Sequence, residues 1–268
     1  MLRSEGFFGF KENNLSSFAT ENYKSVSHNC NKAVIAAYYN VKKYGFEFDD
    51  DYIKVDQNRR TVYWIVGPNF DIKRIKADKP AVFISEYPIS KKLEKEVCYE
   101  LESLFSIPST AINRGIKFSD RNDVSIVGYK KDARLDLLYS GWKHTKESDP
   151  KTFLMTFNPA RYYRSYELAD FGYNIYQKLI LIKDQPYAVI NFALQDDRAF
   201  ELSFLSLFKD PELKLVNDQN DCIIVNCLHD LYKQHGIKYV NLGTSAGIKG
   251  LAFFKKRHPH FEQIVYRA

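Results

Sequence analysis

Residues 237–257 decide the fold, and they read IKYVNL, GTSAG and IKGLAFFKKR in succession. Residues 237–242 form a short apolar run of the kind that makes a buried strand. Residues 243–247 follow as a turn whose two glycines permit positive φ angles and close backbone approach. Residues 248–257 have apolar positions at helical spacing and cations in the last turn. This strand–turn–helix can direct N–H groups at an anion, although such junctions also use glycine for steric reasons alone.

The composition is that of a folded protein with one or two domains. Of the 268 residues 45% are hydrophobic and 27% charged, which excludes a disordered chain. The net charge of +6 favours anionic partners, either a phosphorylated cofactor or a nucleic acid. The four cysteines, Cys30, Cys98, Cys222 and Cys227, are scattered. Cys222 and Cys227 have neither metal-site nor disulfide spacing and are expected to be buried thiols on a helix. The N-terminus lacks a signal peptide and no run approaches 18 apolar residues, so we expect a cytoplasmic protein.

The first half predicts strands and helices in mixed order. The run Asp49–Asp51 lacks the alternating ligands and central glycine of a calcium loop, so a solvated turn is expected. The polar stretch 141–151 has no periodicity and is the best linker, dividing the chain into 1–150 and 151–268. The expected elements are helices at 31–44, at 90–105 with Ser90 as N-cap, and at 133–139, and strands at 60–66, 81–85 and 124–129.

The second half predicts the order β-β-β-α-β-α-β. Three strands joined by tight turns make an antiparallel meander, and a helix ends near His235 with Gly236 as its cap. A short helix is expected before the meander, at 163–170. The expected strands are 178–182, 187–194, 200–208, 237–242 and 261–266.

That order resembles the GNAT-type N-acyltransferase superfamily over roughly residues 160–268. Residues 239–243 and 247–255 look like the end of the fifth strand and the last helix of that superfamily, and of related aminoacyl-transfer enzymes. The resemblance implies an α/β (α+β) fold with a mixed, mostly antiparallel central sheet flanked by helices. It also implies a catalytic C-terminal half. The N-terminal half is compatible with a second, degenerate copy that shapes acceptor specificity.

The resemblance further implies a site between the strands at 200–208 and 237–242, and no metal. Glu201 would accept the proton of the attacking amine, while Asn241, Thr244 and Ser245 would orient the acceptor or the carbonyl. Glu201 could equally be a solvent-facing carboxylate, and Asn241 a turn-capping side chain. The backbone of Leu205, Ser206, Leu207 and Phe208 would hold the donor arm, and Lys249, Arg161 and Tyr163 are candidates for substrate contacts.

One departure concerns the donor. The superfamily cradles a diphosphate with a glycine-rich turn after its fourth strand, whereas residues 209–218 contain no glycine and several acids. Either Lys209 and Lys214 replace that turn as point charges for acetyl-CoA or another acyl-CoA, or the donor is an aminoacyl ester. The alternative function is a non-catalytic binding module that keeps the fold.

Three further patterns are typical of other kinds of site. Residues 243–247 match the G-x-S-x-G nucleophile elbow, but too little chain follows to supply the other triad members. His258 and His260 have no third ligand nearby in sequence and are expected to be structural. The basic and aromatic run 161–166 is compatible with a nucleic acid or tRNA as a partner.

Overall fold

In the computed structural model, the residues described are 45–49, 51–65, 69–76, 78–128, 174–206, 217–245 and 249–268. Eleven strands form one sheet in the order β1-β2-β3-β4-β11-β5-β10-β9-β8-β7-β6. The strands are β1 (Gly45–Phe48), β2 (Tyr52–Asp56), β3 (Thr61–Ile65), β4 (Ala81–Ser85), β5 (Lys92–Glu100), β6 (Val124–Gly128), β7 (Ile175–Ile182), β8 (Gln185–Gln195), β9 (Arg198–Ser206), β10 (Tyr239–Thr244) and β11 (Phe261–Arg267). The helices are η3 (Ile72–Arg74), α3 (Leu101–Ser106), α4 (Thr110–Arg121), α8 (Asn217–His235) and α9 (Lys249–Lys255).

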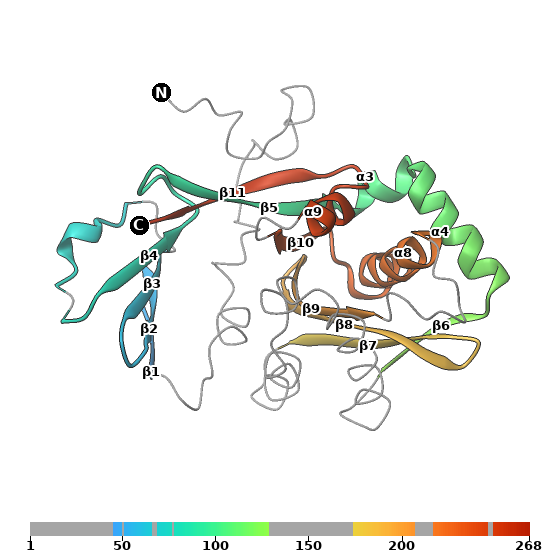
Figure 1. Ribbon diagram of the computed structural model, residues 1–268, viewed down its shortest axis with the longest axis horizontal. Helices are drawn as coiled ribbons and strands as arrows, with labels where there is room; N and C mark the ends of the chain where they lie inside the picture. The colour runs from blue at the N-terminus through green and yellow to red at the C-terminus, as the bar shows by residue number, and fades with distance from the viewer. Residues whose placement is uncertain are drawn as a thin grey trace.

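The sheet is mixed. The pairs β3–β4 and β9–β10 run parallel, and all the other neighbours are antiparallel. The sheet curves strongly around α8, so that β5 and β11 lie across that helix from β7 and β8 (Figure 1). The strands β1 to β4 extend from one end of it, away from α8 and α4. The predicted fold class, a mixed and mostly antiparallel sheet flanked by helices, is confirmed.

The main hydrophobic core fills the concave side of the sheet. It joins side chains of β5, β7, β8 and β10 to the apolar face of α8, and includes Tyr99, Phe192, Ile223, Leu228 and Val240. A smaller cluster supports the extension and joins β2, β3 and β4 to the end of β11. Burial of these side chains supplies most of the free energy that keeps the curved sheet folded.

The C-terminal half has the predicted order, β7-β8-β9-α8-β10-α9-β11. The β7–β8 turn places Lys183 and Asp184 at φ 52° and 62°, and Asp196 in the next turn has φ 53°. Turns with positive φ match the right-handed twist of antiparallel strands, which is why these short connections form a meander. Gly236 after α8 has φ 65°, as its predicted role as cap requires.

The predicted helix at 90–105 is wrong. Residues 92–100 form β5, and a helix, α3, begins only at Leu101. Lysine and glutamate give this stretch a helical pattern, but Val97, Cys98 and Tyr99 favour a strand and lie completely within the sheet. Pairing with β11 on one side and β10 on the other overrides the local helix propensity.

Four further elements, β1, β2, η3 and α4, were not predicted. β1 and β2 form a hairpin around the run Asp49–Asp51, where the backbone N–H of Asp51 donates to the carboxylate of Asp49 at 3.0 Å. The predicted solvated turn is therefore confirmed, but not the strands beside it. α4 follows Pro108 directly, with the Ser109 hydroxyl accepting from the Ile112 N–H as its N-cap. The linker at 141–151 and the helices expected at 31–44, 133–139 and 163–170 lie outside the described residues.

Candidate functional site

The parallel strands β9 and β10 are paired only where they begin. Their register joins Tyr239 to Arg198, Val240 to Ala199 and Asn241 to Phe200, and ends there. Beyond that point β9 continues to Ser206 paired with β8, and β10 continues to Thr244 beside β5. The two facing strand edges therefore separate after Asn241, as the family resemblance implied.

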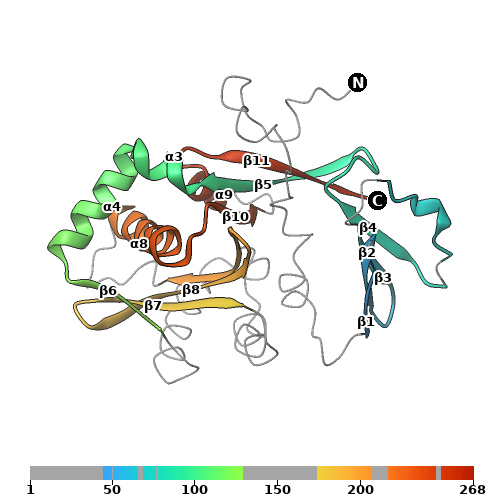
Figure 2. The same ribbon diagram turned by 180° about the vertical axis from the view of Figure 1, so that it is seen from behind.

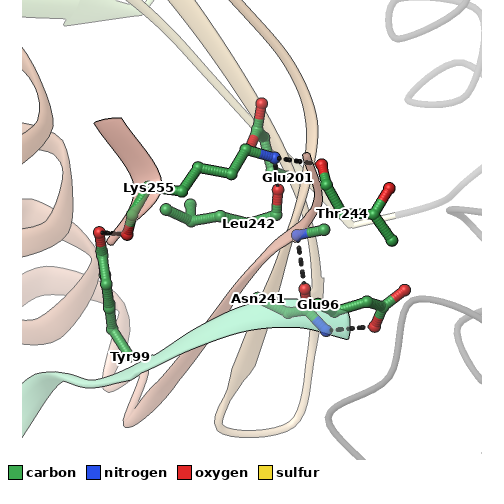
Figure 3. A network of polar contacts seen from close by, with 8 residues as sticks. Glu96, Tyr99, Glu201, Asn241, Leu242, Thr244 and Lys255 are labelled. Atoms are coloured by element: carbon green, nitrogen blue, oxygen red, sulfur yellow. Dashed lines mark hydrogen bonds and ion pairs between the residues drawn. The ribbon is translucent and has the colours of Figure 1, made fainter. Parts of the chain in front are cut away.

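Lys255 occupies this separation. Its ammonium donates to the backbone oxygens of Leu242 and Thr244, the latter at 3.1 Å, and lies 3.4 Å from a carboxylate oxygen of Glu201 (Figure 3). The residue is only 5% exposed. Because carbonyl oxygens on a strand edge need donors, the lysine replaces N–H groups that an adjoining β9 would have supplied to β10.

Tyr99 and His258 fix the end of α9 that carries this lysine. The Tyr99 hydroxyl donates to the backbone oxygen of Lys255, and burial raises the Tyr99 pKa so far that the hydroxyl stays protonated. The His258 ring packs edge-on against Tyr99, and its Nδ1 lies 3.2 Å from the Ser109 hydroxyl. Burial, helped by the charge of Arg257, lowers the His258 pKa to about 4, so this imidazole is neutral at pH 7.

Asn241 shapes the strand that carries the two carbonyl groups. Its amide nitrogen donates to the Glu96 carboxylate at 2.8 Å, and its amide oxygen accepts from the Gly243 N–H at 2.6 Å. The register between β10 and β5 shifts between Asn241 and Thr244, and Gly243 has φ 70°. The glycine thus permits a bulge that residues with side chains rarely adopt, and Asn241 holds it.

The described site places a buried cation and a carboxylate where two strands part. An ammonium shielded from water can donate to an oxygen that acquires negative charge, and shielding strengthens that interaction. The Glu201 carboxylate can accept a proton from a group bound beside it. Cys98, Cys222 and Cys227 are buried, the last two as predicted, and burial raises the pKa of each thiol, that of Cys222 to about 11. A thiolate nucleophile is therefore not available among them.

The structure brings several predicted residues together. Glu201 and Thr244 both contact Lys255, and Asn241 lies in the bulge beside them. The Ser245 hydroxyl is buried without a hydrogen-bond partner among the described residues. Lys249 begins α9 and is exposed, while the backbone of Leu205 and Ser206 pairs with Val189 and Ala188 of β8. The remaining predicted contacts lie outside the described residues: Leu207, Phe208, Lys209, Lys214, Arg161 and Tyr163.

Sequence reasoning missed Lys255, Tyr99 and Glu96. Lys255 stands in a run of three cations at a helix end, a pattern that the helix dipole already explains. The sequence gives one sign that Lys255 is partly buried, because it follows the apolar Phe254 near the end of the helix. Tyr99 and Glu96 belong to the strand that was predicted as a helix.

The histidines expected to be structural make protein contacts. Nδ1 of His260 donates to the backbone oxygen of His258 at 2.8 Å, and His258 contacts Ser109. Within the described part of the chain, no three side chains of the metal-binding types cluster closely enough to hold an ion. Nor does any described helix combine the length and the apolar character needed to cross a bilayer.

Solved structures share this architecture at low sequence identity. No protein-family model matches the sequence, and no curated protein matches it. A conserved protein of unknown function from Bacteroides thetaiotaomicron is similar with TM-score 0.63 and 12% identity, over 94% of this chain and 95% of the other. The C-terminal domain of a proposed lysylphosphatidylglycerol synthetase from Agrobacterium fabrum is similar with TM-score 0.56 and 11% identity, over 90% of this chain and 86% of the other.

FemX is similar with TM-score 0.52 and 10% identity, over 84% of this chain and 89% of the other. At these identities the comparisons define the fold. Together with the separated β9 and β10, they show that the chain has a GNAT-like fold.

Proposed function

We propose that this protein transfers an acyl or aminoacyl group to an amine at the point where β9 and β10 separate. The observation that carries the proposal is the buried Lys255 between Glu201 and two backbone oxygens of β10. It puts a donor for an oxyanion and an acceptor for a proton 3.4 Å apart. Direct acyl transfer to an amine requires both groups.

The reaction would proceed without a covalent enzyme intermediate. The amine nitrogen bonds to the carbonyl carbon of the donor while Lys255 donates to the carbonyl oxygen as it becomes negative. The bond from that carbon to the ester oxygen or thioester sulfur then breaks. Glu201 takes the proton that the nitrogen loses, and the leaving group is protonated in turn.

An aminoacyl ester suits the sequence better than acyl-CoA as the donor. The connection from β9 to α8 has no glycine to admit a diphosphate. Acyl-CoA remains the alternative donor, with Lys209 and Lys214 as the available cations. The acceptor is an amine of unspecified structure.

Turnover by two neighbouring lysine variants tests the proposal. Lys255→Met removes the buried cation, whereas Lys256→Met removes the exposed cation next to it. With aminoacyl-tRNA and acetyl-CoA offered as donors to a mixture of amines, we expect Lys255→Met to lose at least about a hundredfold in rate. Lys256→Met should stay near wild type. Glu201→Gln, which keeps the side-chain shape, should slow transfer without weakening donor binding. Equal rates for both lysine variants would contradict the proposal.

One observation favours the second candidate, a binding module without catalysis. Two carbonyl groups and a carboxylate already surround the Lys255 ammonium, so the lysine can serve as a structural link between β9 and β10. This candidate predicts no turnover with either donor. It also predicts a large loss of stability in Lys255→Met that Lys256→Met does not share.

A further inference from the structure

The turn between β2 and β3 and the crossover from β3 to β4 gather basic side chains. Residues 57–80 contain six basic and two acidic side chains, so this stretch carries +4 of the chain's net charge of +6. All six cations are exposed, and none forms an ion pair with another described residue. We call this set the basic edge; it consists of Arg59, Arg60, Lys73, Arg74, Lys76 and Lys79.

The parallel pairing of β3 and β4 brings the two segments together. Thr61 is in register with Ala81, and the Thr61 N–H donates to the Pro80 oxygen at 3.0 Å, so Arg60 lies beside the end of the crossover. Lys79 is close enough to Asp56 to help lower its pKa, after the larger effect of the hydrogen bond from Thr61. The β2–β3 turn and the end of the crossover therefore lie side by side, and Lys73, Arg74 and Lys76 belong to the same crossover.

Aromatic side chains pack beside the crossover that carries part of the basic edge. Phe70, just before η3, packs edge-on against Tyr52 with ring centres 5.6 Å apart. Tyr52 in turn contacts Tyr63, which stacks on Phe83 at 5.2 Å. The Asp71 carboxylate caps η3 by accepting from the Lys73 N–H at 3.0 Å, so one of the two acids in the stretch is already engaged. These contacts hold the start of the crossover, which carries Lys73 and Arg74, against β2.

We propose that the basic edge binds the phosphate backbone of a polynucleotide. Exposed cations that form no ion pairs release counterions when they meet a row of phosphates, and this release drives binding. A bilayer surface fits less well, because the large apolar side chains exposed in the described chain, Leu93, Ile107, Ile116 and Phe253, all lie outside residues 57–80. The region lies at the end of the sheet away from α8 (Figure 2), so it is separate from the site at which β9 and β10 part.

Fluorescence anisotropy with a short labelled RNA and a duplex DNA of equal length tests this proposal. The full chain is titrated between about 50 and 200 mM salt. The test variant is Arg74→Glu/Lys76→Glu, in the basic edge. The matched control is Lys117→Glu/Arg121→Glu, which makes the same charge change at exposed positions of α4. Thermal melting verifies that both variants are folded.

We expect the test variant to weaken binding about tenfold and to flatten its salt dependence, while the control stays within about twofold of wild type. A preference for either RNA or DNA would identify the natural polymer. Equal weakening in both variants would contradict the proposal, since net charge alone would then explain binding. So would the lack of salt-dependent binding by the wild type, or variant effects seen only with phosphatidylglycerol vesicles.

Discussion

Asn241 is the residue that links the strand geometry to the chemistry of the site. Asn241 is only 1% exposed. Its side-chain amide donates a hydrogen bond to the Glu96 carboxylate and accepts one from the Gly243 N–H. A buried carboxylate that loses a hydrogen-bond donor is destabilised, because water cannot replace that donor in the interior. The bulge that carries two of the Lys255 partners therefore depends on this side chain.

Replacing Asn241 should destabilise the protein in a pH-dependent way. Asn241→Ala should cost about 2–3 kcal/mol in the free energy of unfolding, since it removes a donor from a buried charged group. Asn241→Asp places a second carboxylate next to Glu96, so one of the pair must bind a proton and its pKa rises. A raised pKa favours folding at low pH, so Asn241→Asp should be closer to wild type at pH 5 than at pH 7.5. Urea unfolding at the two pH values measures this, and equal losses at both would contradict it.

Because of His258, we expect mild acidification to lower the free energy of unfolding. Its pKa in the folded protein is about 4, whereas a histidine in an unfolded chain titrates near 6.5. Between these values the unfolded chain binds the proton and the folded chain does not. Above pH 6.5 the neutral His258 therefore contributes about 3 kcal/mol to the free energy of unfolding. This contribution is lost as the pH falls to 4.

Urea unfolding of the wild type and of His258→Gln from pH 7.5 to pH 4 isolates that contribution. Carboxylate titration affects both proteins in the same way, so the difference between their slopes reports on the histidine. Identical slopes between pH 6.5 and 4 would show that His258 is accessible to protons in the folded state.

At the scale of elements, the crossing of α4 and α8 depends on one glycine. A Cβ atom at Gly115 would lie 2.9 Å from the backbone carbon of Asp221 and 3.0 Å from the backbone nitrogen of Cys222. Backbone atoms cannot move aside cheaply, so the helices would have to separate. Asp221 is itself buried and bound by Arg257 at 2.8 Å, which adds to the constraint.

Gly115→Ala should therefore lower the free energy of unfolding by about 1–3 kcal/mol, despite the better helix propensity of alanine. Gly128→Ala is the matched control, because a Cβ atom there meets nothing within 4 Å. That control should be neutral or slightly stabilising. Thermal melting compares the two variants, and we expect the lower melting temperature for Gly115→Ala. Equal melting temperatures would contradict the close approach of α4 to α8 at Gly115.

The elements that the sequence predicts well are those whose local pattern and tertiary role agree. β7 to β9 are rich in aliphatic and aromatic residues and are separated by short turns, and α8 has an apolar face that meets the sheet. β5 could not be predicted in this way, because its lysines and glutamates favour a helix and only its two neighbouring strands make it a strand. For the same reason Glu96 and Tyr99 are not among the predicted site residues, whereas Glu201 and Asn241 are, and the structure places both where β9 and β10 part.

At the scale of the whole molecule, the two halves of the chain share one sheet. β5, from the N-terminal half, lies between β10 and β11 and pairs with both. Seven residues of β11 are in register with β5, whereas only two are in register with β4. Without β5, the C-terminal half would expose the inner edges of two buried strands.

The fragment 151–268 should accordingly fail to fold when it is expressed without residues 1–150. Its amide spectrum by NMR should show the narrow dispersion of an unfolded chain, and coexpression with 1–150 should restore it. A well-dispersed spectrum of the isolated fragment would show that β5 is dispensable and that the C-terminal half is an independent domain.

The most direct test of the central claim is to find where the donor binds. Hydrogen–deuterium exchange of the full chain, with and without a non-reactive aminoacyl ester analogue or CoA, reports on each strand separately. The account predicts slower exchange at residues 201–206 of β9 and 242–245 of β10, with β1 to β4 unchanged. Protection confined to other strands, while 201–206 and 242–245 exchange as before, would contradict it.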